Sequence, residues 1–383
     1  MTKYDLIVVG AGNLGTFHAF HALKAGKKVL MLEKDAAPIE ATVRNFGQVV
    51  PSGQALDTWF EYGRTSLDIY GHIQQRTDIS ARPNGSYYLA SDDDELQLLE
   101  EAKQLFQERD YQAHLLTSTV CIEKIPSLKN SYCKGGLFFP QEFSVEPRLM
   151  VNRVRNLLIQ EYGMEYLNNT TVIDCAVNQG ICEVVSAKGE KFFAEKVAIC
   201  NGRDFKALYP ELFENSDLSI CKLNMMSTVP MPEVELRGNI LSGLSIRRYD
   251  SFKSCASYPT IKLPESLEEY QKWGIHILFK QAIDGSIIIG DSHEYASVQQ
   301  AADLDFSINM TINDLILKEA QRMIDLPTWE IQQYWAGYYS QTKDGGIYEH
   351  DIDKKIFIAT GIGGKGMTTS PGFAQKRVKE IFG

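Results

Sequence analysis

Three glycines near the start of the chain have the spacing of a dinucleotide-binding loop. The segment GAGNLG places Gly10, Gly12 and Gly15 between a strand-like apolar run and a stretch of helical composition. In such a loop the first glycine permits a tight turn, the second lets the backbone approach a pyrophosphate, and the third allows close helix–strand packing. We therefore expect the amides at the start of the following helix to bind phosphate.

A carboxylate in the next apolar run completes the pattern of a dinucleotide-binding βαβ unit. The apolar run at 4–10 and the helical stretch at 16–26 are followed by a second apolar run at 27–34, in which Glu33 lies 23 residues after Gly10. A carboxylate at that point accepts hydrogen bonds from a ribose hydroxyl. The segment predicts a βαβ unit that binds a dinucleotide, but it does not distinguish NAD from FAD.

The same glycine spacing recurs near the C-terminus. There GIGGKG carries Gly361, Gly363 and Gly366, and only 17 residues follow. Since a βαβ unit needs roughly 30 residues, this loop is not a second dinucleotide site, and NAD(P) is disfavoured. A glycine loop that opens a terminal helix still offers amides and a positive dipole to an anion. In a flavoprotein the pyrimidine edge of the reduced ring carries such charge.

The elements that must position these loops are of two kinds. The ends of the chain have α/β character, with a helix expected from Glu146-Pro147 to about Tyr162 and a strand, glycine loop and helix at 355–382. The stretch 215–300 is richer in strand and turn signals, including a hairpin around Asp284-Gly285. We predict an α/β Rossmann-like domain that binds the dinucleotide (an FAD-binding domain if the dinucleotide is FAD) and an α+β substrate domain with a mainly antiparallel sheet. The expected boundaries are 1–83, 141–204 and 336–383 for the first domain and 84–140 and 205–335 for the second.

Bulk properties exclude several classes of protein. A net charge of −10 argues against nucleic acid as a main partner. The longest apolar runs are far shorter than the roughly 20 residues of a membrane span. The first strand begins almost at once, which leaves no room for a signal peptide, and seven cysteines without CxxC spacing suggest reduced thiols. We expect a cytoplasmic protein, and no metal-ligand pattern stands out.

Further motifs resemble the FAD-dependent oxidoreductases of the D-amino acid oxidase, glycine oxidase and sarcosine oxidase superfamily over nearly the whole chain. They are RNFGQ at 44–48, VAICNG at 197–202, WAGYYSQTKDGG at 335–346 and GIGGKGMTTSPG at 361–372. Three segments look closer to a subgroup that occurs beside phosphonate-degrading enzymes: VRNFGQVVPSGQA at 43–55, CKLNMM at 221–226 and LSGLSIRRYDSF at 241–252.

The resemblance implies FAD as cofactor, with hydride transfer from an amine-bearing carbon to flavin N5 and hydrolysis of the imine. Some relatives attach FAD through a cysteine near the segment 335–346, whereas the last cysteine here is Cys255, so we expect non-covalent FAD. The implied FAD-binding residues are Gly10, Gly12, Asn13, Leu14, Gly15, Glu33, Lys34, Arg44, Asn45, Phe46, Gly47, Gln48, Val172, Asn201, Gly202, Gly361, Gly363, Gly364, Lys365, Gly366, Met367 and Thr368.

One position departs from the amino-acid oxidases of this superfamily. They commonly carry Gly-x-Arg-Pro after Trp-x-Gly, and that arginine binds the substrate carboxylate; here the position is Tyr339, next to Tyr338. Loss of such a pair costs about 2–5 kcal/mol, which disfavours glycine or a D-amino acid as substrate.

Other cations could take over the role of the missing arginine. Lys365 lies in the glycine loop, and Arg247 and Arg248 lie in the region expected to roof the flavin, where strand neighbours face opposite ways. His293 is a further candidate, although a lone histidine is more often structural, and we interpret His276 as structural. The candidate catalytic residues are Lys365, Arg247, Arg248, Tyr339, Tyr338, Gln48 and His293.

The leading hypothesis is oxidation of a small, anionic aminophosphonate, such as 2-aminoethylphosphonate or its N-methyl form, to phosphonoacetaldehyde and an amine. Oxygen or another acceptor would reoxidise the flavin. The alternatives are a sarcosine, glycine or D-amino-acid oxidase or dehydrogenase with a rebuilt carboxylate site, a tRNA-modifying flavoprotein, which the acidic charge disfavours, and a flavin-binding protein without catalysis.

Overall fold

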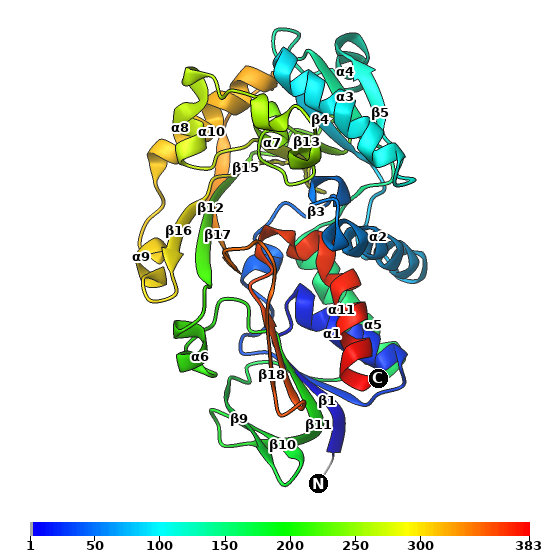
Figure 1. Cartoon of the computed structure of the whole chain (residues 1–383), viewed down its shortest axis with the longest axis vertical. Helices are drawn as coiled ribbons and strands as arrows, with labels where there is room; N and C mark the ends of the chain where they lie inside the picture. The colour runs from blue at the N-terminus through cyan, green and yellow to red at the C-terminus, as the bar shows by residue number, and fades with distance from the viewer. Residues whose placement is uncertain (1–2) are drawn as a thin grey trace.

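Two large sheets organise the chain, one in each half of the molecule (Figure 1). The computed structural model describes residues 3–383. The lower half in Figure 1 holds both termini and a sheet of eight strands, and the upper half holds a sheet of nine strands. The long strands β12 (Ser219–Thr228) and β17 (Ile331–Gln341) pair along their whole length and run down one side of the molecule.

The first sheet is built around the predicted βαβ unit. Strand β1 (Lys3–Val9), helix α1 (Asn13–Lys24) and strand β2 (Val29–Leu32) follow one another, and β1 pairs in parallel with both β2 and β11 (Lys191–Ile199). All four residues of β2 are buried, as expected for a parallel strand covered on both faces. The Rossmann-like architecture predicted from the sequence is confirmed.

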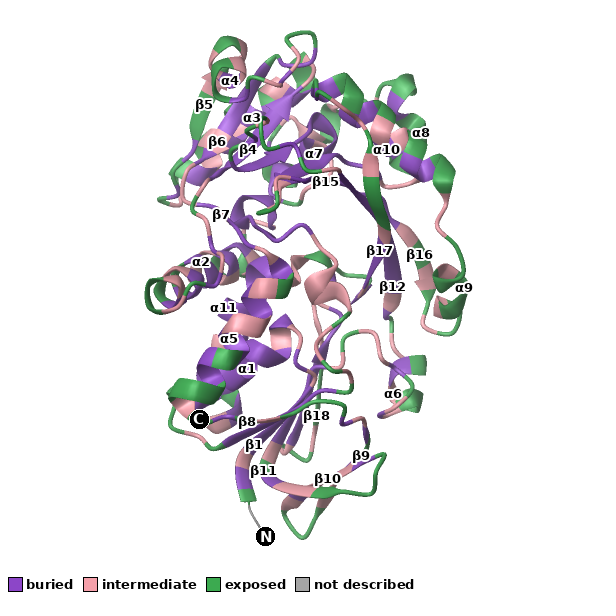
Figure 2. Cartoon of the chain, turned by 180° about the vertical axis from the view of Figure 1, so that it is seen from behind, coloured by how far each residue is buried: buried purple, intermediate pink, exposed green. Residues whose placement is uncertain are grey.

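Helices cover this sheet. Helix α1 is buried on nearly all sides because α5 (Pro147–Tyr162) and α11 (Gly366–Phe382) pack beside it (Figures 1 and 2). The remaining strands of the sheet are β8 (Glu165–Leu167), β9 (Val172–Asn178), β10 (Ile181–Ser186), β18 (Tyr348–Ile352) and β19 (Ile356–Thr360). Figure 2 shows that the exposed residues of this half lie on outer elements, such as the β9–β10 hairpin, and not on α1.

The second sheet is mainly antiparallel, as predicted. Its order is β16-β12-β15-β14-β13-β4-β6-β5, β17 also pairs with β12, and only the β13–β4 pair is parallel. Its other strands are β4 (Ser86–Ala90), β5 (His114–Thr117), β6 (Gly135–Phe139), β13 (Asn239–Leu241), β14 (Leu278–Gln281), β15 (Ile287–Gly290) and β16 (Glu294–Ser297). The predicted hairpin at Asp284-Gly285 is the turn between β14 and β15.

Shorter elements connect the two halves. Strands β3 (Gln48–Val49) and β7 (Phe143–Ser144) form a two-stranded ribbon. The other helices are α2 (Thr58–Arg76), α3 (Asp93–Gln107), α4 (Ser118–Lys124), α6 (Pro210–Glu214), α7 (Gly243–Ile246), α8 (Glu268–Lys272), α9 (Ala301–Asp305) and α10 (Met310–Met323). Short 3₁₀ turns include η1 (Ala41–Val43), η2 (Pro51–Gly53) and η6 (Gly363–Lys365).

One apolar core spans both halves. It contains Phe17 of α1 and Tyr70 of α2 together with Met225 and Leu278 of the second sheet. The two sheets are therefore joined by buried contact and not only by the chain. The domain boundaries stay a prediction. One of them was placed at residue 336, and β17 continues within the second sheet past that point, as far as Gln341. No helix within residues 3–383 is both long and apolar enough to span a membrane.

Candidate functional site

A cavity of about 600 Å³ is lined by elements of both sheets. This volume is within the range of cofactor and ligand pockets. The β1–α1 loop, the end of β2, the segment around η1 and the start of α11 line one part, and β12, β14 and β17 line another. The cavity therefore connects the predicted dinucleotide loop with the predicted substrate domain.

Close backbone approaches account for two of the glycines in the first loop. Gly10 has φ +98°, and a Cβ there would lie 2.4 Å from the carbonyl oxygen of Cys200. A Cβ on Gly15 would lie 2.0 Å from the carbonyl oxygen of Gly10. Gly10 thus lets β1 turn beside the end of β11, and Gly15 lets α1 start directly above that turn.

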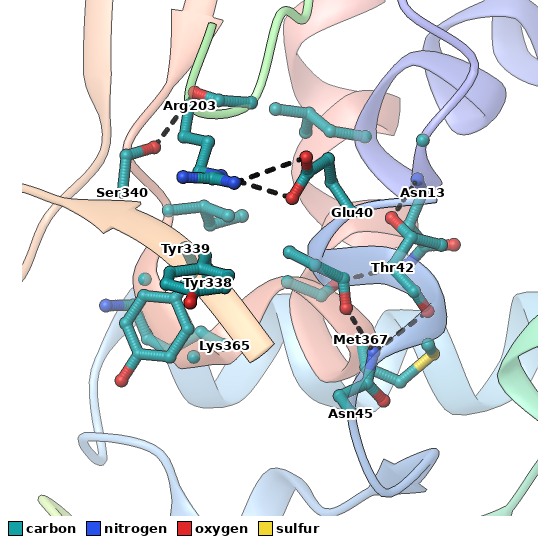
Figure 3. A pocket seen from close by; sticks show the side chains of 18 of the residues that line it. Asn13, Glu40, Thr42, Asn45, Arg203, Tyr338, Tyr339, Ser340, Lys365 and Met367 are labelled. Carbon is teal, nitrogen blue, oxygen red and sulfur yellow. Dashed lines mark hydrogen bonds and ion pairs between the residues drawn. The ribbon is translucent and has the colours of Figure 1, made fainter. Parts of the chain in front are cut away.

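Asn13 joins the two glycine loops, which are more than 340 residues apart in sequence. Its Nδ2 donates to the carbonyl oxygen of Gly366 at 3.0 Å and contacts the Tyr70 hydroxyl at 3.0 Å. Its backbone N–H donates to Thr42 Oγ1 at 2.9 Å, which fixes the η1 segment against α1 (Figure 3). The N-termini of α1 and α11 are therefore held side by side along the cavity.

The acidic residue at the end of β2 is buried and anchored. Glu33 Oε2 accepts a hydrogen bond from the Ala11 N–H at 2.8 Å, and Oε1 accepts one from the Asp35 N–H at 3.1 Å. Its carboxylate thus lies at the glycine loop, where a ribose would be expected. Nearby, Asn201 Oδ1 is buried and has no hydrogen-bond partner within residues 3–383. Glycine-lined backbone, helix N-termini, a carboxylate and an unpaired acceptor fit an FAD.

Most of the predicted FAD residues line this cavity. The exceptions are Gly15 and Gly47, which serve packing; a Cβ on Gly47 would lie 2.1 Å from the Val145 carbonyl oxygen. Arg44 lines the cavity, and its Nη1 donates to the carbonyl oxygen of Ala336, so it also holds β17 in place. Cys255 is buried beside Leu98 and does not line the cavity, whereas Cys200 does, so non-covalent attachment of FAD stays a prediction.

The two candidate arginines, Arg247 and Arg248, point to different surroundings. We expected them on a strand, which is wrong: they follow the short helix α7. Arg247 lies outside the cavity lining and forms ion pairs with Asp92 at 2.6 Å and Glu95 at 2.7 Å. Arg248 lines the cavity; its Nη2 donates to the Tyr295 hydroxyl at 3.2 Å, and no Asp or Glu within residues 3–383 forms an ion pair with it.

The two tyrosines of β17 have different surroundings. The Tyr338 hydroxyl donates to the Leu304 carbonyl oxygen at 3.3 Å, and the guanidinium of Arg203 lies 4.3 Å from the centre of its ring. Tyr339 lies beside the C-terminal glycine loop, since a Cβ on Gly364 would be 3.5 Å from its hydroxyl (Figure 3). Burial raises the pKa of Tyr339 well above its ordinary value, so the phenol stays protonated.

Lys365 follows Gly364 in the C-terminal glycine loop and lines the cavity (Figure 3). Its Nζ donates to the Gly345 carbonyl oxygen at 2.6 Å and lies 4.7 Å from the centre of the Trp59 ring. Burial lowers the pKa of this lysine, although nearby carboxylates oppose the shift. The ammonium is thus held between the loop after β17 and helix α2.

Sequence reasoning missed a polar cluster in the cavity wall. His276, which we interpreted as structural, lines the cavity with Asp291 and His293. His276 Nε2 is 3.0 Å from Asp291 Oδ1, and the His276 and His293 rings stack with centroids 5.5 Å apart. Burial lowers the pKa of His293 to about 3 and also lowers the pKa of His276, so both rings are neutral near pH 7. Extending the predicted hairpin outward from Asp284-Gly285 would have placed these residues opposite one another.

Arg203 was also missed. It follows the VAICNG segment and lines the cavity, where it pairs with Glu40 at 3.1 Å and Asp305 at 3.0 Å (Figure 3). It thereby connects the loop after β11 with the segment before η1 and with α9. Because Glu40 and Asp305 are both far from Arg203 in the sequence, no local motif indicates these ion pairs.

The cavity has two kinds of wall. A Rossmann-type sheet with two glycine loops forms one part, and a mainly antiparallel sheet forms the other. This arrangement defines a two-domain flavoprotein. The sequence matches the model of the FAD dependent oxidoreductase family over residues 5–377, and the chain belongs to that family. The predictions of an FAD-dependent oxidoreductase and of FAD as cofactor are confirmed.

Similar proteins, two of them of known structure, match nearly the whole chain. Glycine oxidase from Bacillus licheniformis is 24% identical, over 100% of this chain and 94% of its own. The structure of glycine oxidase from Bacillus cereus has a TM-score of 0.77 at 21% identity and covers 99% of this chain and 95% of its own. L-α-glycerophosphate oxidase from Mycoplasma pneumoniae, solved with FAD bound, also has a TM-score of 0.77, at 16% identity, with the same coverage of both chains.

Proposed function

We propose that this enzyme oxidises a carbon–nitrogen bond in a small anionic amine, with an aminophosphonate such as 2-aminoethylphosphonate or its N-methyl form as the leading substrate. The products would be phosphonoacetaldehyde and ammonia or methylamine. The observation that carries the proposal is Arg248, a cation in the cavity wall that forms no ion pair with an Asp or Glu within residues 3–383, although Asp291 is near enough to raise its pKa.

The environment of Arg248 favours an anionic ligand. A desolvated charge is costly unless it is paired, and among residues 3–383 its guanidinium donates a hydrogen bond only to the Tyr295 hydroxyl. A planar guanidinium can bind two oxygens of a phosphonate or carboxylate at once. Tyr339, at the position where related amino-acid oxidases place an arginine, supplies a neutral hydroxyl and no charge.

The chain's own residues would position the substrate for FAD. Bound FAD supplies the hydride acceptor, and water then hydrolyses the oxidised product. Arg248 would hold the anionic end, while the buried side chains of Met225 and Leu278 limit water in the same cavity. Binding energy used in this way orients the reacting C–H bond. The final acceptor of the electrons would be oxygen or another oxidant.

An amino acid is the second candidate. Three glycine oxidases are among the similar proteins, and Arg248 can bind a carboxylate as well as a phosphonate. In that case the arginine would have moved from β17 to the segment after α7. The amine chemistry would be the same, and only the anionic group would differ.

A substrate panel separates these candidates. Purified yellow protein is mixed without oxygen with N-methyl-2-aminoethylphosphonate, 2-aminoethylphosphonate, sarcosine, glycine or D-alanine, and loss of flavin absorbance is followed. We expect a phosphonate to bleach the flavin fastest. Faster bleaching by an amino acid would overturn the phosphonate assignment, and the absence of bleaching with every amine would overturn carbon–nitrogen oxidation itself.

A further inference from the structure

We propose that His276, Asp291 and His293 form a binding site for one divalent transition metal, of the kind that prefers imidazole ligands, such as Zn²⁺. One ligand atom from each residue lies within 4.8 Å of the other two, and all three residues are buried. Two imidazoles and one carboxylate with open positions toward a cavity are a common metal-binding set. The inference concerns a metal and is independent of which amine the enzyme oxidises.

The hairpin β14–β15 creates this arrangement. His276 precedes β14, and Asp291 and His293 follow β15. Backbone hydrogen bonds between His276 and Asp291, at 2.9 and 3.2 Å, extend the pairing beyond the two strands. The three side chains are therefore positioned by sheet geometry and not by a flexible loop.

The second nitrogen of each imidazole already has a partner. His293 Nδ1 lies 2.9 Å from the Gly274 carbonyl oxygen, which can only accept, so Nδ1 carries the proton and Nε2 is left as a ligand. His276 Nδ1 lies 3.1 Å from Ser245 Oγ, and its Nε2 faces Asp291. Metal-binding histidines typically have such an outer partner, which fixes the ring and its tautomer.

The positive charge of Arg248 near the three ligands determines which metals the site can bind. Arg248 lines the same cavity, and its positive charge opposes any cation held by electrostatics alone. A metal that bonds strongly to imidazole nitrogen overcomes this repulsion, whereas Mg²⁺ and Ca²⁺, which prefer oxygen ligands, do not. Binding would replace the contact between His276 Nε2 and Asp291, and the single N–H of the neutral His276 ring would then be on Nδ1, where it can donate to Ser245 Oγ.

A metal at this site would affect catalysis. Because its ligands line the cavity that also contains Arg248, bound Zn²⁺ would occupy space needed by the substrate. Zinc is therefore expected to inhibit in competition with the amine, and substrate is expected to lower the affinity for zinc.

The test is equilibrium dialysis of the yellow holoprotein against Zn²⁺, with metal content measured afterwards. We expect one equivalent of zinc to be retained in the presence of excess Mg²⁺. Ser245→Ala should weaken binding about 10- to 100-fold, because it removes an outer partner, and His293→Gln should weaken it further. His72→Gln, which changes an exposed histidine on α2, is the matched control and should bind zinc like the unmodified protein.

X-ray absorption at the zinc edge gives a measurement that needs no variant. We expect two imidazole nitrogens and a carboxylate oxygen at about 2.0–2.2 Å from the metal. Less than one equivalent of retained zinc, a spectrum without imidazole ligands, or equal retention by a folded, yellow His293→Gln variant would overturn the proposal. None of these outcomes depends on the identity of the amine.

Discussion

Arg247 and Arg248 are consecutive residues with opposite partners. Arg247 turns away from the cavity and forms ion pairs with Asp92 and Glu95, whereas Arg248 lines the cavity and contacts a tyrosine hydroxyl. The first guanidinium is neutralised by protein carboxylates, whereas the second forms no ion pair with an Asp or Glu within residues 3–383, as its proposed role in binding an anionic substrate requires. Their two substitutions should therefore have different effects.

Replacing Arg248 by alanine should weaken substrate binding. Truncating one partner of a desolvated charge pair costs about 2–5 kcal/mol, so we expect KM to rise at least about 30-fold. Lysine at this position should recover part of the loss, since it restores charge but not the planar geometry. Steady-state kinetics checks this, with the exposed Arg237→Ala variant as control. An unchanged KM would remove Arg248 from the binding site.

Replacing Arg247 by alanine should instead weaken the fold. Glu95 is buried, and an uncompensated buried charge destabilises a protein by about 3–5 kcal/mol. We expect lower resistance to urea and little change in KM in the protein that remains folded. Adding Glu95→Gln should restore part of the stability. An Arg247→Ala variant as stable as the parent would contradict this account of the pair.

Replacing Gly15 by alanine should expel FAD. The added Cβ would lie 2.0 Å from the Gly10 carbonyl oxygen, so the first glycine loop would have to move. We expect a sharply lower ratio of flavin to protein absorbance after purification. Gly26→Ala is the control, because a Cβ there meets nothing within 4 Å despite a positive φ, and it should cost about 1 kcal/mol and keep the flavin. Equal flavin content in both variants would contradict the prediction.

Glu142 should make stability depend on pH. Its carboxyl group is buried, accepts hydrogen bonds from the Ser52 N–H and the Tyr111 hydroxyl, and has its pKa raised by burial from 4.5 to about 7. A carboxyl with a raised pKa in the folded state contributes stability below its unfolded pKa and loses it as pH rises through the folded pKa. The wild-type protein should therefore lose up to about 3 kcal/mol between pH 4.5 and pH 8 from this group.

The Glu142→Gln variant should remove this part of the pH dependence. Urea unfolding at several pH values measures it, with the exposed Glu123→Gln variant as control. A Glu142→Gln protein whose stability falls with pH as steeply as that of the parent would show that the carboxyl group does not titrate in this range.

The sequence predicted the fold well because its strongest signals are local. The glycine loop with Glu33, the helix after Glu146-Pro147 and the hairpin at Asp284-Gly285 each depend on neighbouring residues, and each is present. The arginines were misplaced on a strand because the four-residue helix α7 lies within a region rich in strand signals.

The substrate side of the site was harder to predict because it depends on distant pairs. The residues near Arg247 in the sequence do not indicate that its ion-pair partners are Asp92 and Glu95. His276 becomes part of a cluster only when β14 and β15 pair. The subgroup resemblance, the roles of Lys365 and Tyr339 and the aminophosphonate substrate stay predictions.

The Asn13 contacts that join the two glycine loops have a consequence for how such an enzyme changes over evolutionary time. They lie on α1, α2 and α11, whereas Arg248, His293 and Tyr339 are carried by the second sheet and its connections. Arg248 and His293 take part in none of the hydrogen bonds of that junction, so substitutions at these two positions leave the contacts between the glycine loops in place. One frame that holds the flavin can in this way give rise to enzymes that act on different substrates, because substitutions in the second sheet leave the hydrogen bonds between the cofactor loops unchanged.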